Sequence, residues 1–197
     1  MKTEFEVKFY PINKSSIRTL LKSANAQLII TERKLKRTVF DKTDNPQINV
    51  DYLRVRDEGN IVRLSAKIHA KESGNLEDQK ETDVIVSEYA KTIELLMLSG
   101  LKITSYQENL RETWELANAE VVIDTWPGLE PYIEIEADSS ETVKHVSQLL
   151  DQDWAKRRIT SIVEIYAEKY NLTNLQVISK LNHITFEDNP FDIRKWG

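Results

Sequence analysis

The sequence predicts an α+β fold, a barrel of antiparallel strands with helices packed outside it. The first observation is an alternation of charged and apolar residues with period two, which begins at Glu4–Lys8 and returns at Tyr132–Glu136. A β-strand sends alternate side chains to opposite faces, so each segment has one charged and one apolar face. Because a row of charges is costly in a dry core, we expect the charged faces to line a wet cavity. The second observation is a set of segments with apolar residues at helical spacing, which would cover the apolar faces.

The alternation places strands along the first two thirds of the chain. In order, they are expected at residues 3–10, 37–42, 50–57, 61–69, 79–86, 102–107, 109–116, 119–125 and 131–137. Alone, each segment also fits a solvated amphipathic strand, but the recurrence of one pattern in so many segments favours a shared cavity. The expected inward charges are the carboxylates of Glu4, Glu6, Glu81, Asp83, Asp124, Glu134 and Glu136 and the cations of Lys8, Arg54, Arg56, Arg63 and Lys67.

Helices are predicted where apolar residues recur every three to four positions. They are expected at residues 14–24, 88–99, 140–151, 159–170 and 173–182. Ser139 is a suitable N-cap for the third helix, and Gly100 is a suitable C-terminal stop for the second. Residues 183–197 are expected to form a polar, aromatic tail.

The composition excludes several classes of protein. A chain of 197 residues with 40% hydrophobic residues can bury one substantial core. The net charge of −5 argues against a nucleic-acid-binding protein, which usually carries a basic excess. The absence of cysteine excludes disulfides, thiol catalysis and thiolate metal sites. We find neither a signal peptide nor an apolar run long enough to span a membrane, so we expect a cytoplasmic protein without membrane contact.

Two sets of opposite charges on inward faces indicate a ligand that itself combines both signs. Carboxylates bind hard divalent cations through oxygen, which suits Mg²⁺ or Mn²⁺. Arginine and lysine bind phosphate oxygens, arginine often through two parallel hydrogen bonds. A chain of phosphates bridged by a metal ion would satisfy both sets.

The residues that carry these charges resemble the CYTH family, the triphosphate tunnel metalloenzymes. The resemblance rests on six blocks in order, which cover roughly residues 1–170: Glu4–Lys8 (the Glu-x-Glu-x-Lys signature), Leu53–Asp57, Arg63–Lys67, Lys80–Asp83, Val122–Asp124 and Pro131–Glu136. It implies an eight-stranded antiparallel tunnel over residues 1–172, followed by a C-terminal helical tail over residues 173–197. The family includes thiamine triphosphatase, inorganic triphosphatases and class IV adenylate cyclases.

The resemblance also implies residue roles. The triphosphate would be bound by Lys8, Arg54, Arg56, Lys67 and Arg111. The metal ions would be bound by Glu4, Glu6, Asp124, Glu134 and Glu136, with Lys67 and Glu81 as the candidate catalytic residues. Two positions depart from the family: Val39 stands where relatives often carry tyrosine, and Asn109 stands where they commonly carry lysine.

Other charged and aromatic residues have simpler interpretations. The run Lys34–Arg37 is expected to be a solvated strand end, and Trp126 is expected to pack in the core. Arg63 is expected to be more peripheral than Lys67.

The sequence therefore predicts a metal-dependent triphosphatase whose substrate is most simply inorganic triphosphate, because no base- or thiamine-specific element is visible. The alternatives are a class IV adenylate cyclase, which makes cyclic AMP from ATP, and a non-catalytic binder of polyphosphate or nucleotide. The expected partner is a small triphosphate-containing molecule, and the sequence is compatible with a homodimer.

Overall fold

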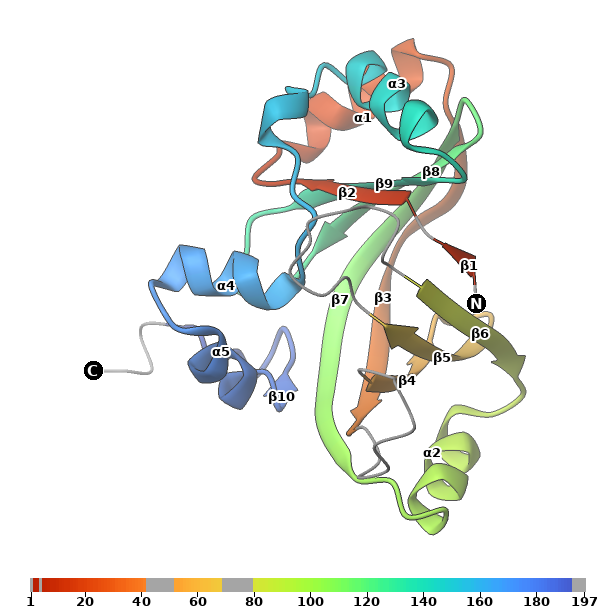
Figure 1. Ribbon diagram of the computed structural model, residues 1–197, viewed down its shortest axis with the longest axis vertical. Helices are drawn as coiled ribbons and strands as arrows, with labels where there is room; N and C mark the ends of the chain where they lie inside the picture. The colour runs from red at the N-terminus through yellow and green to blue at the C-terminus, as the bar shows by residue number, and fades with distance from the viewer. Residues whose placement is uncertain (1, 4, 42–51, 69–79, 193–197) are drawn as a thin grey trace.

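A computed structural model describes residues 2–3, 5–41, 52–68 and 80–192 of the chain. Its central feature is one strongly curved sheet (Figure 1). The strands are β1 (Lys2–Thr3), β2 (Phe5–Phe9), β3 (Gln27–Phe40), β4 (Tyr52–Asp57), β5 (Val62–Ile68), β6 (Lys80–Val86), β7 (Ile103–Leu116), β8 (Ala119–Thr125), β9 (Tyr132–Ala137) and β10 (His183–Ile184).

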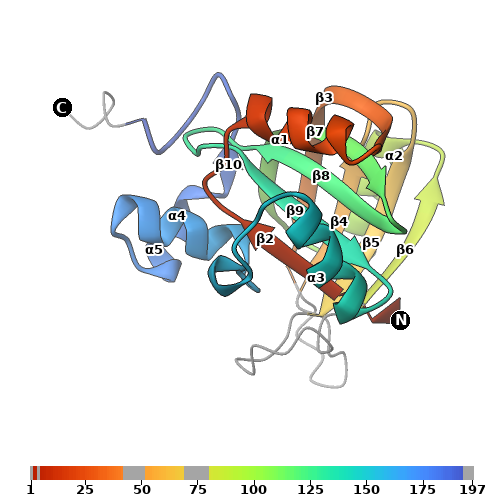
Figure 2. The same cartoon turned by 90° about the horizontal axis from the view of Figure 1, so that it is seen from above.

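The N-terminal segment belongs to both edges of this sheet. The strand order is β1-β6-β5-β4-β3-β7-β8-β9-β2, so β1 pairs with β6 at one edge and β2 pairs with β9 at the other. Only residue 4 separates β1 from β2, and the two therefore count as one strand. The described residues then form eight antiparallel strands that curl into a half-barrel (Figure 2). The predicted α+β fold with an eight-stranded antiparallel sheet and helices outside is confirmed.

Two long strands differ from their expected lengths. β3 begins at Gln27 rather than at residue 37, and its pairing with β7 shifts register between Leu28 and Ile30 and again between Ile30 and Arg33. These irregularities interrupt the period-two pattern, which explains why the sequence shows only the last part of the strand. β7 is one strand, where two were predicted, because β3 pairs with it from residue 103 to residue 115.

In the described residues, the α-helices are α1 (Lys14–Ser23), α2 (Tyr89–Leu98), α3 (Ser140–Leu149), α4 (Ile162–Tyr170) and α5 (Asn174–Lys180), with a short 3₁₀ helix at Trp154–Lys156. Of these α-helices, α1, α3 and α5 begin at polar residues whose side chains cap them: Asn13, Ser139 and Thr173. Ser139 caps α3 as predicted, because its Oγ accepts a hydrogen bond from the Thr142 amide at 3.1 Å. This bond satisfies one of the amides that a helix N-terminus leaves unpaired.

Two apolar cores hold the helices to the sheet. The larger core joins α1 and α3 to the outer faces of β2, β7, β8 and β9, with Val7, Ile135 and Val146 fully buried. The second core joins α4, α5 and β10 to the turn after β8, and it includes Trp126 and Ile184. β10 pairs in parallel with the part of β7 that precedes the residues paired with β8. The apolar faces of β2, β7, β8 and β9 thus meet helices, and the charged faces of these strands are left to the concave side.

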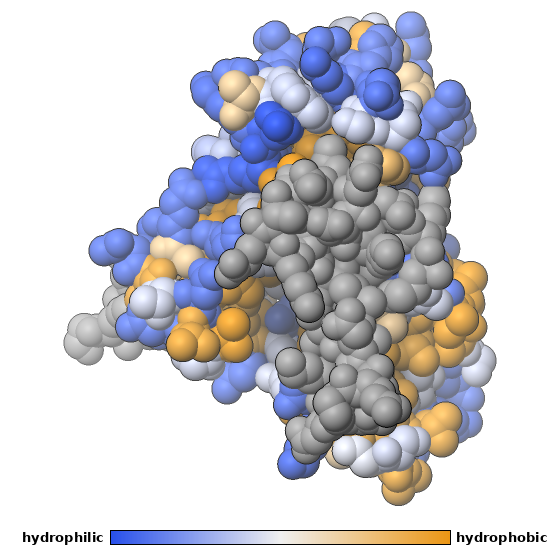
Figure 3. Space-filling model, viewed as in Figure 1, coloured by the Kyte–Doolittle hydropathy of each residue, from blue (hydrophilic) through white to orange (hydrophobic). Residues whose placement is uncertain are grey.

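Helix α2 and the neighbouring strand β6 carry an exposed apolar surface. No residue of α2 is buried, and Figure 3 shows hydrophobic side chains gathered over β6 and α2. These side chains include Val84, Ile85, Leu95, Met97 and Leu98.

Candidate triphosphate and metal site

The concave side of the sheet encloses a cavity of about 1060 Å³. Its wall is formed by strands from every part of the sheet, by residues 159–164 and by α5. Among the described residues, seven cationic side chains line it: Lys8, Arg33, Arg37, Arg54, Arg56, Arg63 and Arg111. The register explains part of this concentration, because Arg37 of β3 lies opposite Arg56 of β4, and Arg56 lies opposite Arg63 of β5. Neighbouring strands therefore contribute a row of guanidinium groups to one wall.

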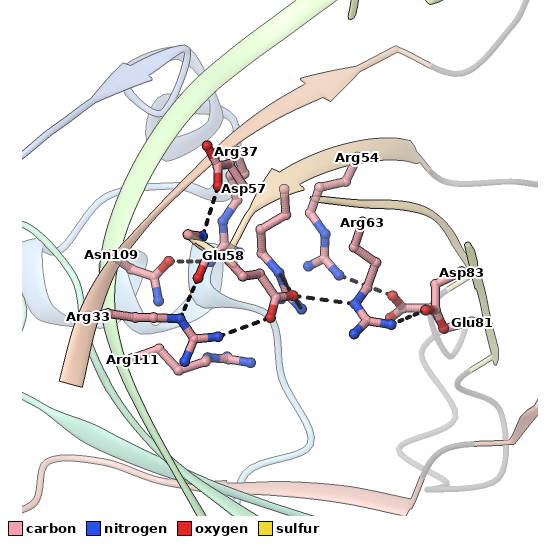
Figure 4. Close-up of polar contacts among 12 residues, drawn as sticks. Arg33, Arg37, Arg54, Asp57, Glu58, Arg63, Glu81, Asp83, Asn109 and Arg111 are labelled. Carbon is pink, nitrogen blue, oxygen red and sulfur yellow. Dashed lines mark hydrogen bonds and ion pairs between the residues drawn. The ribbon is translucent and has the colours of Figure 1, made fainter. Parts of the chain in front are cut away.

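A buried carboxylate just after β4 organises three of these arginines (Figure 4). Glu58 is 7% exposed, and its oxygens lie 2.7 Å from Arg56, 3.3 Å from Arg63 and 3.2 Å from Arg33. Burial favours its neutral form, but the charge of Arg56 and the other arginines outweighs burial and lowers the pKa of Glu58. Burial, with the charges of Arg54 and Arg111, lowers the pKa of Arg56 to about 10. The arginine cluster is thus only partly neutralised.

Arg111 is held on the other wall by two carboxylates. Its Nε donates to Asp124 Oδ1 at 2.8 Å, and its Nη2 donates to Asp124 Oδ2 at 2.5 Å and to Glu134 Oε2 at 2.8 Å. Burial alone would lower the pKa of Arg111, but Asp124 and Glu134 raise it well above its usual value. Asp124 is fully buried and also accepts hydrogen bonds from Asn109 and Tyr132. Both of its oxygens are occupied by these donors, so its predicted role as a metal ligand stays a prediction.

Carboxylates from two adjacent strands face the cavity beside Lys8. Glu6 of β2 lies opposite Glu136 of β9, and Lys8 lies opposite Glu134. The Lys8 ammonium contacts Glu6 and lies 3.3 Å from Glu134 Oε1. Oxygen-only donors suit a hard divalent cation, so this set fits Mg²⁺ or Mn²⁺ chemically. Within the described ranges, no three acidic or histidine side chains yet converge closely enough to hold a metal ion.

Most of the predicted site residues meet in this one cavity. Its wall includes Glu6, Lys8, Arg54, Arg56, Glu81, Arg111, Asp124, Glu134 and Glu136. Glu81 accepts a hydrogen bond from Arg54 Nη2 at 3.1 Å. Glu4 lies outside the described residues. Lys67 lies opposite Glu81 in the β5–β6 ladder, but its side chain is also outside the described part of the structure.

Sequence reasoning missed several residues of the wall, and three of them hold or extend its arginine cluster. Arg33, Arg37 and Glu58 line the cavity, although the run Lys34–Arg37 was expected to be solvated. For Arg37 that interpretation is wrong, because its side chain is buried while Lys34 and Lys36 point to solvent. The signal was present in the alternation of Arg33 and Arg37 with the lysines between them. Arg63 also lines the cavity, where it contacts Asp83 and Glu58.

Comparison with known proteins identifies the family. Residues 2–161 match the CYTH domain. The chain belongs to the CYTH family. Members of this family are triphosphatases or adenylate cyclases and are generally metal-dependent, so the CYTH assignment supports an enzyme. A search of curated protein sequences finds no significant match.

Solved structures share the CYTH fold at low sequence identity. A conserved hypothetical protein from Pyrococcus furiosus is 20% identical, with a TM-score of 0.66 over 82% of this chain and 98% of that one. A candidate adenylate cyclase from Vibrio parahaemolyticus is 14% identical, with a TM-score of 0.69 over 84% and 98%. HpAC1 from Hippeastrum, described as having a dominant triphosphatase activity, is 13% identical, with a TM-score of 0.55 over 88% and 97%. At these identities the likeness shows the fold alone. Among the described residues, no helix is both long and apolar enough to cross a membrane.

Proposed function

We propose that the protein hydrolyses inorganic triphosphate to diphosphate and orthophosphate in this cavity, with Mg²⁺ or Mn²⁺ bound. The observation that carries the proposal is the wall of the cavity, where seven cations and a group of carboxylates of the described residues face one space. Phosphoryl transfer depends mostly on positioning and on neutralising the oxygens of the phosphate chain. The cavity can do both, because arginine guanidinium groups bind phosphate oxygens through paired donors.

We assign the cationic side chains to the phosphate groups and the carboxylates to the metal ion. Lys8, Arg54, Arg56 and Arg111, together with Lys67, would bind the non-bridging oxygens of the triphosphate. Glu6, Glu134 and Glu136 would hold the metal, with Asp124 and Glu4 completing the predicted set. When bound, the metal would neutralise phosphate charge and orient the attacking water.

Water would supply the oxygen that attacks the terminal phosphorus. The bond from that phosphorus to the bridging oxygen then breaks, and diphosphate leaves. Glu81 and Lys67 are the candidates for moving the protons, because their backbone positions face each other on β6 and β5. Glu81 is held beside Arg54, at the cavity wall.

A panel of triphosphates tests this proposal. Orthophosphate, diphosphate and cyclic nucleotide release should be measured from inorganic triphosphate, ATP and thiamine triphosphate, with Mg²⁺ and with Mn²⁺. We expect the fastest turnover with inorganic triphosphate and release of one orthophosphate. Dominant cyclic AMP formation from ATP would replace the proposal with an adenylate cyclase, and binding without turnover would replace it with a non-catalytic binder.

The metal role has a separate test. Glu134→Gln and Glu136→Gln should each raise the metal concentration needed for half-maximal rate, because each removes a charged oxygen ligand. Glu115→Gln is the control, since Glu115 is exposed on β7 and does not line the cavity. Unchanged metal titrations in both cavity variants would remove these residues from the metal site.

A further inference from the structure

Arg37 is the arginine of the described cavity wall whose charge no carboxylate contacts. The other five each have a carboxylate within 3.3 Å: Arg33, Arg56 and Arg63 at Glu58, Arg54 at Glu81, and Arg111 at Asp124 and Glu134. Arg37 is only 7% exposed, and within the described ranges no carboxylate reaches it. Its Nη2 donates instead to the neutral amide oxygen of Asn109. A buried guanidinium is therefore left without a carboxylate of the described residues in direct contact, since Asp124 is reached only through Asn109, an arrangement that proteins normally avoid.

Arg37 is stacked on the ring of Trp126, and both side chains carry a buried N–H group without an acceptor among the described residues. The guanidinium carbon of Arg37 lies 4.7 Å from the centre of the Trp126 ring. Arg37 Nε and Trp126 Nε1 are both buried, and neither finds a hydrogen-bond acceptor in the part of the chain that the structure describes. Arg33 and Arg54 each have one unpaired nitrogen too, but a carboxylate neutralises each of them. The ring face stabilises the cation without neutralising it or accepting from its N–H groups.

The surroundings add further positive charge. Burial and the charges of Arg54, Arg56 and Arg111 outweigh the opposing charge of Asp124 and lower the pKa of Arg37 to about 9. Arg37 remains charged at neutral pH, so the cations at this wall repel one another. An anion bound here would remove the repulsion and give both unpaired N–H groups an acceptor.

We propose that Arg37 and Trp126 form an anion subsite that binds one phosphoryl group at an end of the phosphate chain. The inference rests on the proposed function and deepens it, because it adds a specificity-determining pair to the substrate site. Non-bridging phosphate oxygens are acceptors only, and they match the two unpaired donors in chemistry and in charge. An apolar group at this position would leave both donors unpaired, and a neutral acceptor would leave the guanidinium without a charge in contact.

The subsite favours a long polyanion. Arg37 lies on β3 in the middle of the strand order, whereas Lys8 lies on β2 at its end, and both line the same cavity. An anion that reaches both must extend across the curved sheet. Triphosphate can make more of these contacts than diphosphate, and diphosphate more than orthophosphate.

Arg37→Met separates a binding role from a structural one. If Arg37 binds the anion, the variant without ligand should melt at the wild-type temperature or above it, because an unneutralised buried charge has been replaced by an apolar chain. Its affinity for triphosphate should fall by about tenfold or more, and its KM should rise with little change in kcat. Lys36→Met is the matched control, because Lys36 is the neighbouring residue of β3 and its side chain is exposed. The control should bind as the wild type does.

Trp126→Phe provides a second and milder test. It keeps an aromatic ring under Arg37 but replaces the indole by a smaller ring without an N–H. We expect a severalfold loss of triphosphate affinity and a smaller loss for orthophosphate. Both variants should be compared by the rise in melting temperature with inorganic triphosphate, with and without Mg²⁺.

The outcomes distinguish this inference from the proposed function. The subsite is wrong if Arg37→Met and Trp126→Phe keep wild-type triphosphate affinity, or if Arg37→Met lowers the melting temperature without ligand while affinity is kept. If the wild type hydrolyses triphosphate in that case, the proposed function stands without the subsite. If the wild type binds triphosphate without hydrolysing it and both variants weaken binding, the subsite stands and the hydrolase does not. A wild type that does not bind triphosphate overturns both.

Discussion

Glu58 is the residue around which the cationic wall is organised. It is buried immediately after β4, and three arginines from β3, β4 and β5 contact its carboxylate. One negative charge thereby fixes several guanidinium groups without cancelling them. Their donors are positioned in advance for an anion, which reduces the ordering that binding would otherwise require.

Arg56→Lys should reduce triphosphate turnover even though it keeps the charge. Arg56 donates through Nε at 2.9 Å and Nη2 at 2.7 Å to Glu58, and it still has a further nitrogen for a phosphate oxygen. A lysine ammonium is a compact point charge and cannot reproduce this planar geometry. We expect kcat/KM to fall by about tenfold or more, equivalent to ~1.4 kcal/mol of transition-state stabilisation.

The control for this change is Arg157→Lys, because Arg157 is exposed and lies over the Trp154 ring, away from the cavity. Steady-state kinetics with inorganic triphosphate measures both variants. Equal activity of Arg56→Lys and the wild type would show that Arg56 does not bind the substrate through paired donors.

At the scale of elements, the segment after residue 172 is part of the packed structure. α5 begins with a capping box, in which Thr173 and Gln176 satisfy each other's amides. β10 joins the sheet beside β7, and Val177 and Ile184 are fully buried in the second core. The expected boundary between residues 172 and 173 stays a prediction, but the tail contributes a wall of the cavity and packs against Trp126.

Ile184→Ala should therefore destabilise the whole protein. The side chain is fully buried, and removing it leaves a cavity in the second core. Such truncations cost about 2–5 kcal/mol. Leu175→Ala, in the same C-terminal segment but 79% exposed, should change stability by less than about 0.5 kcal/mol. Urea denaturation followed by tryptophan fluorescence measures both variants. An independent tail would show an Ile184→Ala effect confined to a separate early transition.

At the scale of the whole molecule, the helical layer of α4 and α5 is joined to the sheet by an electrostatic contact as well as by the second core. Glu130, in the turn before β9, accepts from Lys169 of α4 at 2.7 Å and also from Tyr10, which follows β2. The hydrogen bonds from Lys169 and Tyr10 lower the pKa of Glu130 to about 2, from a usual 4.5. One carboxylate thus connects three parts of the chain that are distant in sequence.

This contact makes stability depend on pH in acid. Since folding lowers the pKa of Glu130, its contribution is fully present above pH 4.5 and is lost as the pH falls towards 2. The free energy of unfolding of the wild type should exceed that of Glu130→Gln at pH 6, and the difference should shrink progressively below pH 4.5. Because the side chain is half exposed, solvent screening keeps the effect small. Urea midpoints between pH 2.5 and pH 6 measure it, and a difference that does not vary with pH would contradict the assignment.

Prediction from sequence worked where the alternation was regular and failed where the backbone interrupts it. Residues of β2, β4 and β9 were correctly assigned to the charged face, because these short strands keep period two throughout. The first part of β3 was missed because its register shifts break the period, and Arg33, which follows the second shift, lay outside the predicted strand although the alternation is regular from there to Val39. Glu58 was missed because it follows its strand, where alternation no longer indicates the direction of a side chain.

The sequence by itself determined the family, the antiparallel α+β architecture and the presence of a polar cavity, because side-chain alternation depends only on local backbone geometry. The tertiary structure decided which charges neutralise one another. Arg56 was expected to face inward and Arg37 to be solvated, yet both line the cavity: Arg56 meets Glu58, whereas Arg37 meets Asn109 and the face of Trp126. That difference arises from the curvature of the sheet and from the packing of α4 and α5 behind Trp126, which bring together residues far apart in the chain. That Arg37 has no carboxylate of the described residues in contact is therefore a property of the folded molecule, since electrostatic interactions depend on distance in space.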